Sequence, residues 1–220
     1  MAYVHVEQAV KSFPREDGTD MLVLGGVSFD AKERGITCLL GPSGCGKSTL
    51  LNVIARLERL DQGYVEIVSN HGESATRPPQ LGYVFQDPRL LNWKRVEENL
   101  IFALRGMDVP RRQWDERIHT YLGLVGLLEF RKQYPLYLSG GMRQRVGLAR
   151  ALVIEPDILL MDEPFSKLDQ LTARKLREDT LEICARLKQS ALLVTHDVEE
   201  AAYMGDRIVI FSARPAHIVE

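Results

Sequence analysis

Residues 41–49 of this chain are Gly41-Pro42-Ser43-Gly44-Cys45-Gly46-Lys47-Ser48-Thr49, which matches the pattern G-x-x-x-x-G-K-[ST] of phosphate-binding loops. The short apolar segment 35–40 precedes the loop and predicts a buried strand. Residues 50–57 follow it with the apolar spacing of a helix. A chance glycine-rich turn would lack these flanks. The stretch therefore predicts a phosphate-loop nucleotide-binding core.

The loop has the chemistry of a polyphosphate site. Its glycines let several backbone N–H groups point at one anion, and the following helix adds partial positive charge at its N-terminus. Lys47 is expected to reach the β- and γ-phosphates, and the Ser48 hydroxyl is expected to ligate Mg²⁺. All nine residues from Gly41 to Thr49 are therefore candidate contacts to a nucleoside triphosphate. The loop alone does not identify the reaction.

The composition narrows the class of protein. The net charge of −2 gives no global basic field of the kind that binds nucleic acid. No apolar run approaches the ~20 residues of a membrane span, and the first six residues alternate like an edge strand rather than a secretory signal. Cys38, Cys45 and Cys184 form no C-x-x-C pair, which favours a reducing cytosol without zinc or disulfides.

The residue pattern predicts an α/β fold with two additions to the core. Residues 3–10 and 22–30 are expected to form strands joined by a polar turn, giving an antiparallel β-layer over the nucleotide. Further on, the apolar spacing becomes helical over 96–104, 113–122 and 124–131, with Pro110 and Gly123 as breaks and with no strand pattern.

We therefore expect one domain over residues 1–220. Its phosphate-loop core, a mostly parallel sheet, is assigned with the β-layer to residues 1–93 and 150–220. Residues 94–149 are assigned to an inserted helical subdomain.

Three predicted strands lead into polar residues suited to nucleotide chemistry. Strand 81–85 is followed by Gln86, strand 158–163 ends in Asp162 and Glu163, and strand 191–195 is followed by His196. Because ligands of open α/β sheets bind outside the carboxyl ends of the strands, we expect these side chains to face one crevice.

Each of these residues suggests a role. Asp162 is expected to hold Mg²⁺ through water, and Glu163 to orient or deprotonate a water molecule. Gln86 is expected to touch Mg²⁺ or the attacking water, although Asp87-Pro88 also fits a turn glutamine. His196 is expected to join the same crevice, and a helix-capping histidine is the alternative.

Two more features are open to a functional and a structural interpretation. Ser139, Gly140 and Gly141 open a predicted helix, which gives either a second anion site or a capped structural helix. Phe13, at the start of the polar turn, either stacks on an adenine or is a half-buried hairpin aromatic.

Taken together, these motifs make the chain resemble the ATP-binding subunit of ABC transporters over nearly its whole length. They occur in the order of that family: the phosphate loop, Gln86, the signature 138–144 beginning Leu-Ser-Gly-Gly, Asp162 and Glu163, the D-loop 166–169, and the switch His196. The signature is close to diagnostic, because other phosphate-loop ATPases lack it. The resemblance implies that ATP contacts come from Phe13, Ser139, Gly140, Gly141, Gln144 and Asp169.

The amino-acid sequence of four stretches is similar to that of the nitrate, sulfonate and taurine importer branch of this family. They are Leu90–Trp93, Leu138–Arg145, Met161–Ser166 and Ser212–Pro215. That branch also includes importers of pyrimidine and flavin precursors. Two residues depart from it, Lys167 where the D-loop commonly has alanine and Asn92 where proline is frequent. The chain also stops soon after its last predicted strand, residues 207–211.

The resemblance implies an ATPase that uses ATP and Mg²⁺ in a head-to-tail homodimer. The signature of one copy would close on the ATP held by the loop of the other, and hydrolysis would reopen the dimer. Gln86 and residues 87–95 would pass this motion to a separate membrane permease at the cytoplasmic face of the membrane. A solute-binding protein would deliver the solute, and nucleic acid is not an expected partner.

Three other functions were weighed. A non-transport ABC ATPase usually carries long coiled-coil insertions or two cassettes, and this chain has neither. A phosphate-loop kinase would need an acceptor site and leaves the signature unexplained. A non-catalytic nucleotide-gated scaffold would not require the intact set Lys47, Asp162, Glu163 and His196.

Overall fold

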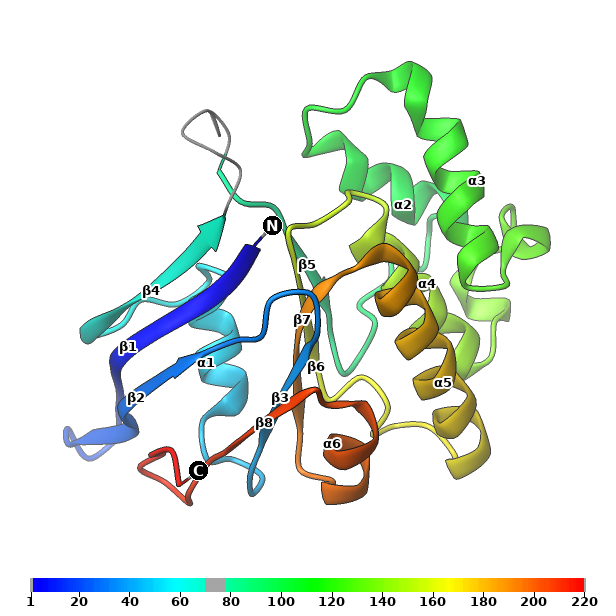
Figure 1. Ribbon diagram of the computed structural model, residues 1–220. Helices are drawn as coiled ribbons and strands as arrows, with labels where there is room; N and C mark the ends of the chain where they lie inside the picture. The colour runs from blue at the N-terminus through cyan, green and yellow to red at the C-terminus, as the bar shows by residue number, and fades with distance from the viewer. Residues whose placement is uncertain (1, 70–77, 220) are drawn as a thin grey trace. The chain divides into compact units, whose positions relative to one another are not determined.

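The computed structural model describes residues 2–69 and 78–219 (Figure 1). The chain divides into two compact units, Met1–Pro79 with Lys188–Glu220, and Gln80–Leu187. The first unit is therefore built from both ends of the sequence, and the second is one continuous segment.

The first unit contains the antiparallel β-layer that the sequence predicts. Its strands are β1 (Ala2–Pro14), β2 (Asp20–Asp30) and β4 (Gln62–Ser69), in the order β2-β1-β4. Val4 and Val6 of β1 are fully buried while their neighbours are half-exposed, so the strand buries one face. At the hairpin end, Phe13 lies opposite Met21.

The same unit contains parallel strands, of which the last is mostly exposed and the other two are buried along almost their whole length. β3 (Ile36–Leu40) pairs with β7 (Ser190–Thr195) on one side and with β8 (Arg207–Ile210) on the other. The described residues of this unit also form the helices α1 (Lys47–Ile54) and α6 (Val198–Met204). In the register of the sheet Leu40 lies beside Thr195, so the phosphate loop and the segment after β7 begin at the same edge.

The second unit combines two parallel strands with helices. β5 (Leu81–Val84) pairs with β6 (Ile158–Asp162). Between them lie α2 (Val96–Arg105), α3 (Trp114–Leu124) and α4 (Gly140–Leu152), with 3₁₀ turns at Arg111–Gln113, Leu128–Phe130 and Pro135–Tyr137. α5 (Gln170–Leu187) follows β6. All residues between β5 and β6 are described, and none of them forms a strand.

Two predicted helix boundaries are wrong, for the same physical reason. The helix expected over 124–131 does not form, because α3 runs through Gly123 and stops before Gly126, whose φ is +68°. Leu127 N then bonds Leu122 O at 2.8 Å, which closes a Schellman cap. The helix expected over 50–57 begins earlier, at Lys47, and ends at Ile54 because Arg56 has φ +60°. Residues 70–77, between β4 and β5, lie outside the described residues.

The three cysteines are free and buried. Burial raises the pKa of the Cys38 thiol to about 12, with the nearby carboxylates Glu200 and Asp206 adding to the shift. Burial alone raises the pKa of Cys184 to about 12. These two side chains therefore remain protonated thiols near neutral pH.

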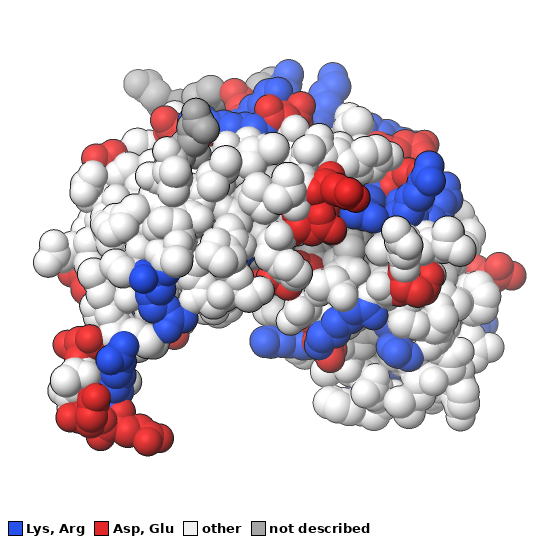
Figure 2. Space-filling model, turned by 90° about the horizontal axis from the view of Figure 1, so that it is seen from below, with Lys and Arg blue, Asp and Glu red and all other residues white. Residues whose placement is uncertain are grey.

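The surface carries both signs of charge. On the face seen in Figure 2, Lys and Arg side chains are interspersed with Asp and Glu, and no extended basic field appears. Within the described residues, none of the helices is long and apolar enough to cross a membrane.

The β-layer depends on Gly63, which sits in β4 with φ +79°. A Cβ there would lie 2.2 Å from Gln8 O and 2.4 Å from Glu7 O. Gly18, in the β1–β2 turn, has a similar φ of +81° but nothing within 4 Å of its added Cβ. A side chain at either position would therefore have the same backbone strain, but only the one at position 63 would also clash with neighbouring backbone atoms.

We expect Gly18→Ala to lower the free energy of unfolding by about 1–2 kcal/mol, the cost of a left-handed residue. Gly63→Ala should lower it by about 2–5 kcal/mol, because overpacking against backbone is added. Urea unfolding of both variants measures the difference. Equal losses would show that β4 moves away from β1 at no cost.

Candidate functional site

The phosphate loop of the first unit has a backbone that only glycine adopts easily. Gly44 has φ +75° and Gly46 has φ +125°, and Gly46 is the residue just before α1. A Cβ on Gly46 would lie 2.9 Å from Val23 Cγ1 on β2. The loop thus turns tightly between β3 and the N-terminus of α1, as a phosphate cradle requires.

Lys47 is the first residue of α1, and its side chain is almost fully buried. Its Nζ donates hydrogen bonds to Gly41 O at 2.7 Å and Pro42 O at 2.8 Å, and lies 3.8 Å from Cys45 Sγ. The ammonium therefore lies against the loop, next to the turn that precedes the helix. Ser48 follows it in the first turn of α1 and is exposed.

Phe13 is half-buried on β1 next to the hairpin turn. Lys11 Nζ lies 5.0 Å from the centroid of its ring. This is the hairpin position that the structural interpretation expects, and the exposed part of the ring leaves the adenine interpretation open.

His196 follows β7 at the edge where the phosphate loop also begins, and it is exposed. The helix cap that was its alternative role belongs to Asp197. Asp197 Oδ1 accepts hydrogen bonds from Glu199 N at 2.8 Å and Glu200 N at 3.2 Å, at the start of α6. The N-cap of α6 is therefore Asp197 and not His196.

In the second unit, the residues after β5 and β6 meet. Gln86 Nε2 lies 3.4 Å from Glu163 Oε2 and donates to Ser166 Oγ at 3.1 Å. Ser166 Oγ in turn donates to Glu163 O at 2.9 Å. Glu163 has φ +43°, a left-handed conformation that costs about 1–3 kcal/mol in a residue other than glycine. Such strain is typical of functional positions.

Asp162, the last residue of β6, is oriented by a residue that the sequence analysis did not single out. Tyr83 on β5 makes a side-chain hydrogen bond to Asp162. Burial first, and then the Asp162 charge, raise the pKa of the Tyr83 phenol, so Tyr83 is a neutral hydroxyl donor. Ser166 was likewise not predicted as a site residue. The D-loop position of Ser166 was its only signal in the sequence.

The signature segment caps α4. Ser139 is the N-cap, and its Oγ accepts from Met142 N at 3.3 Å. Gly141 is buried against α5, where an added Cβ would lie 2.5 Å from Thr172 Cγ2. Gly140 has more room, with its added Cβ 3.6 Å from Leu168 Cδ2. The exposed Ser139 and Gly140 thus present the N-terminus of a thirteen-residue helix.

The other two residues implied by the signature and D-loop have structural partners. Gln144 is buried, and its Nε2 donates to Phe85 O at 3.0 Å, directly before Gln86. Asp169 accepts from Thr172 N at 3.0 Å at the start of α5. Hydrogen bonds from the Thr172 side chain and backbone lower the pKa of Asp169, so this carboxylate stays ionised near neutral pH.

The predicted site residues are thus divided between the units. The first unit holds Phe13, the loop 41–49 and His196, and the second holds Gln86, Asp162, Glu163 and the signature. The proposed Mg²⁺ ligands offer hydroxyl, amide and carboxylate oxygens, the hard donors that Mg²⁺ prefers. No cluster of three or more His, Cys, Asp and Glu suited to a metal occurs among the residues described.

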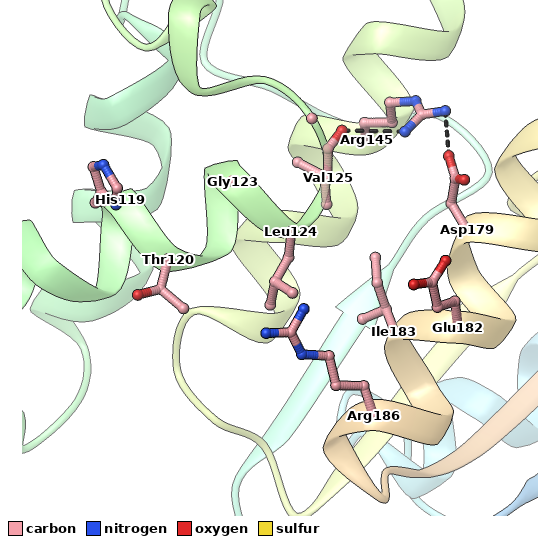
Figure 3. A pocket seen from close by; sticks show the side chains of 11 residues that line it. His119, Thr120, Gly123, Leu124, Val125, Arg145, Asp179, Glu182, Ile183 and Arg186 are labelled. Carbon is pink, nitrogen blue, oxygen red and sulfur yellow. Dashed lines mark hydrogen bonds and ion pairs between the residues drawn. The ribbon is translucent and has the colours of Figure 1, made fainter.

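A cavity of about 510 Å³ lies within the second unit, apart from all of these residues. Its lining comes from the end of α3 and the following turn, from Arg145 of α4, and from Asp179 to Arg186 of α5 (Figure 3). Leu124 and Ile183 are apolar residues of this lining, and Glu182 and Arg186 are charged ones.

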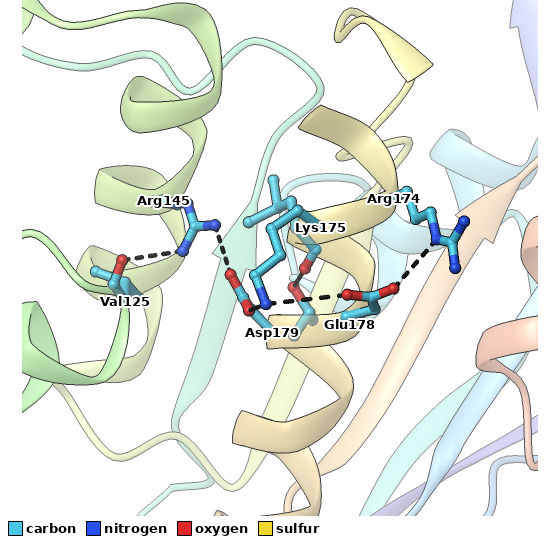
Figure 4. Close-up of polar contacts among 8 residues, drawn as sticks. Val125, Arg145, Arg174, Lys175, Glu178 and Asp179 are labelled. Carbon is cyan, nitrogen blue, oxygen red and sulfur yellow. Dashed lines mark hydrogen bonds and ion pairs between the residues drawn. The ribbon is translucent and has the colours of Figure 1, made fainter. Parts of the chain in front are cut away.

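Arg145 joins three elements at this cavity (Figure 4). Its Nη2 lies 2.5 Å from Asp179 Oδ2 on α5, and its Nη1 donates to Val125 O after α3 at 3.1 Å. Lys175 adds a second contact to Asp179 at 3.1 Å. The pair therefore connects α4, which carries the signature at its start, to α5, which follows the D-loop.

Asp179→Asn should lower the free energy of unfolding by about 1–3 kcal/mol, because it removes a charged partner from the half-buried Arg145. Glu178→Gln is the matched control one residue away. Its contacts to Arg174 and Lys175 are exposed, so its loss should stay below about 0.5 kcal/mol. Urea unfolding compares the two variants, and similar values would contradict a structural role of the Arg145 link.

Comparison with known proteins supplies relatives over most of the chain. The family model described as ABC transporter matches residues 24–166. The taurine import ATP-binding protein TauB of Rhizobium johnstonii is 43% identical over 97% of this chain and 81% of its own length. The aliphatic sulfonates import ATP-binding protein SsuB of Bacillus cereus is 40% identical over 98% of this chain and 83% of its own.

Two further comparisons bear on length and fold. The bicarbonate transport ATP-binding protein CmpC of Synechococcus elongatus is 41% identical over 97% of this chain, which spans only 32% of that protein. Among solved structures, the ATP-binding cassette MJ0796, in a dimeric post-hydrolysis state bound to ADP and Pi, has a TM-score of 0.80. It shares 29% identity and is matched over 99% of this chain and 97% of its own.

Proposed function

The chain belongs to the ABC transporter family and is an ATPase, and from this premise we propose that it drives solute import through a separate membrane permease. The observation that carries the proposal is the pair of anion-binding helix starts on different units. One is the phosphate loop with Lys47, and the other is the exposed N-terminus of α4 at Ser139. A protein that binds its nucleotide without a partner copy needs only the phosphate loop.

Within one copy, the residues have distinct tasks. Phe13 stacks on the adenine, and the loop with Lys47 binds the phosphates. When bound, Mg²⁺ neutralises charge on the phosphates, and Ser48, Gln86 and Asp162 are the residues that would hold it. The Tyr83 hydroxyl keeps Asp162 oriented.

Glu163 and His196 act on the γ-phosphate. Glu163 polarises the attacking water, and its carboxylate is oriented by Gln86, which is itself held by Ser166. His196 contacts the γ-phosphate from the end of β7. Catalysis is then positioning of the water together with electrostatic stabilisation of phosphoryl transfer.

We place two copies head to tail, so that each ATP lies between the loop of one and the signature of the other. The exposed Ser139 and Gly140 give α4 an N-terminus that a partner's γ-phosphate can approach. The dimeric state of MJ0796 with ADP and Pi supports this arrangement. Gln144 and Asp169 contribute by holding the Gln86 segment and the start of α5.

The permease would dock near the segment that follows Gln86. Trp93 is 72% exposed and Tyr137 is 78% exposed. Their chain segments touch, since Val96 N bonds Gln133 O at 2.9 Å and the Arg95 guanidinium lies 6.0 Å from the Tyr134 ring centroid. Exposed aromatics in the segment that follows Gln86, and in the segment packed on it, suit a contact that passes motion to a cytoplasmic helix of the permease.

The solute is proposed to be a small anion or organic solute of the nitrate, sulfonate and taurine type, delivered by a solute-binding protein. The names of TauB and SsuB support this class. The chain would work at the cytoplasmic face of the membrane. The alternatives are an importer of a pyrimidine or flavin precursor, and an ABC ATPase outside transport. A pull-down of the membrane partner and its binding protein separates them.

Glu163→Gln should keep ATP binding and lower turnover by about 10²–10⁴-fold, because the amide keeps the shape but removes the base. Phosphate release without an added acceptor measures the rate, and size-exclusion chromatography with ATP should show a trapped dimer. Glu129→Gln, an exposed change in the same unit, is the control and should behave as wild type. Near-normal hydrolysis by Glu163→Gln would remove Glu163 from the mechanism.

Ser139→Arg should leave ATP binding intact and abolish hydrolysis, because the bulky side chain blocks approach of α4 to a partner's nucleotide. Ser139→Ala loses the same helix cap, at about 1 kcal/mol, without the bulk, and should keep most of the activity. Phosphate release and nucleotide binding are measured for both.

Mixed dimers test the shared site further. A dimer of one Ser139→Arg copy and one Lys47→Ala copy keeps one site with an intact loop and an intact signature. Partial recovery of activity is therefore expected. Full activity of Ser139→Arg alone would contradict the head-to-tail mechanism.

A further inference from the structure

The segment that follows β8 folds back on itself within the first unit. Phe211 N donates to Leu40 O at 2.7 Å, and Phe211 forms an antiparallel bridge with Ile218. Ser212 closes the loop between them, since its N donates to His217 O at 2.9 Å and its Oγ accepts from His217 N at 3.0 Å. Residues 211–218, called here the C-terminal loop, are therefore closed by their own hydrogen bonds.

The C-terminal loop is also fastened to β2. Ala216 N donates to Val23 O, and Gly25 N donates to Ala216 O, both at 2.9 Å. Ala216 and Phe211 are buried. A Cβ on Gly41, the first residue of the phosphate loop, would lie 2.9 Å from Phe211 Cβ. The C-terminal loop is thus a fixed neighbour of the phosphate loop.

Arg214 extends from this fixed loop to the phosphate loop. Its Nη2 donates a hydrogen bond to Gly44 O, and its Nη1 lies 2.8 Å from Met21 Sδ. Met21 is the cross-strand partner of Phe13, the proposed adenine contact. The guanidinium therefore lies between the outer turn of the phosphate loop and the β-layer edge that carries Phe13.

Within residues 2–69 and 78–219, the charge of Arg214 has no anionic partner. The guanidinium contacts a carbonyl oxygen and a thioether, and no carboxylate pairs with it among the residues described. A guanidinium has five N–H donors and is always charged, so several donors remain after these contacts. Its planar fork suits phosphate oxygens.

We propose that Arg214 is a nucleotide-binding residue whose guanidinium contacts the phosphate chain of bound ATP and ADP from the outer side of the loop. This inference rests on the proposed nucleotide site and adds to it a cation that Lys47 does not supply. It also gives a function to the Ser212–Pro215 stretch. The alternative is a purely structural clamp, in which the bond to Gly44 O is all that matters.

Three substitutions separate charge from structure. Arg214→Met loses both the charge and the donors, Arg214→Gln keeps an amide donor for Gly44 O, and Arg214→Lys keeps the charge without the fork. Arg207→Met is the matched control, because Arg207 is an exposed arginine at the opposite end of β8. Circular dichroism and thermal melts check that each variant is folded.

Binding of a fluorescent ADP analogue, displaced by ATP, ADP or inorganic pyrophosphate, gives the dissociation constants. For Arg214→Met and Arg214→Gln we expect the dissociation constants of all three ligands to rise about 5–30-fold, because a charge-assisted hydrogen bond is lost. Arg214→Lys should recover part of the affinity, and Arg207→Met should match wild type. In steady-state hydrolysis by Arg214→Met and Arg214→Gln, KM should rise, whereas kcat should stay within about 2-fold of wild type.

Wild-type affinity of Arg214→Gln for pyrophosphate would overturn the proposal, because the Gly44 bond alone would then account for the contact. A loss of kcat at unchanged dissociation constants would overturn it as well. If Arg214→Met does not fold, the Gln and Lys variants decide the question. Failure of the wild-type chain to release phosphate from ATP would instead contradict the proposed function, which the binding measurements on Arg214 do not address.

Discussion

The glycine backbone of the phosphate loop is the constraint on which the rest of the nucleotide site depends. Gly46 has φ +125°, and a Cβ added to it would lie 2.9 Å from Val23 Cγ1, so neither the conformation nor the packing tolerates a side chain. The constraint starts α1 directly at Lys47 and directs its N-terminus to the loop. The C-terminal loop packs on the same turn and brings Arg214 to it.

In the second unit, a helix cap and close packing fix the N-terminus of α4. Ser139 begins α4, and Gly141 lets the first turn of α4 lie against Thr172 of α5. Further along α4, Gln144 reaches the segment before Gln86, and Arg145 reaches α5 through Asp179. One helix therefore connects the signature to the residues proposed to position the water, which gives a physical route for the proposed coupling between them.

The sequence was most informative where chemistry requires a fixed spacing of residue types. The structure places the phosphate loop between a strand and a helix, the signature at the start of a helix, and Asp162 and Glu163 at the end of a strand, as the sequence predicts, because each motif depends on neighbouring residues in the chain. It was least informative at helix ends. The pattern assigned the break to Gly123, yet Gly126 adopts the left-handed conformation, because the Schellman cap is chosen by how Leu127 bonds back to Leu122.

The sequence by itself determined the family, and it predicted the nucleotide and the residue types of the site, since motifs of local spacing carry that information. Only the tertiary structure decided which side chains support them. Tyr83 beside Asp162, Ser166 beside Gln86 and Arg214 beside Gly44 come from distant parts of the chain or from turns with no pattern of their own. Their partners follow from strand pairing and loop closure, which bring together residues far apart in the sequence and which no local spacing specifies.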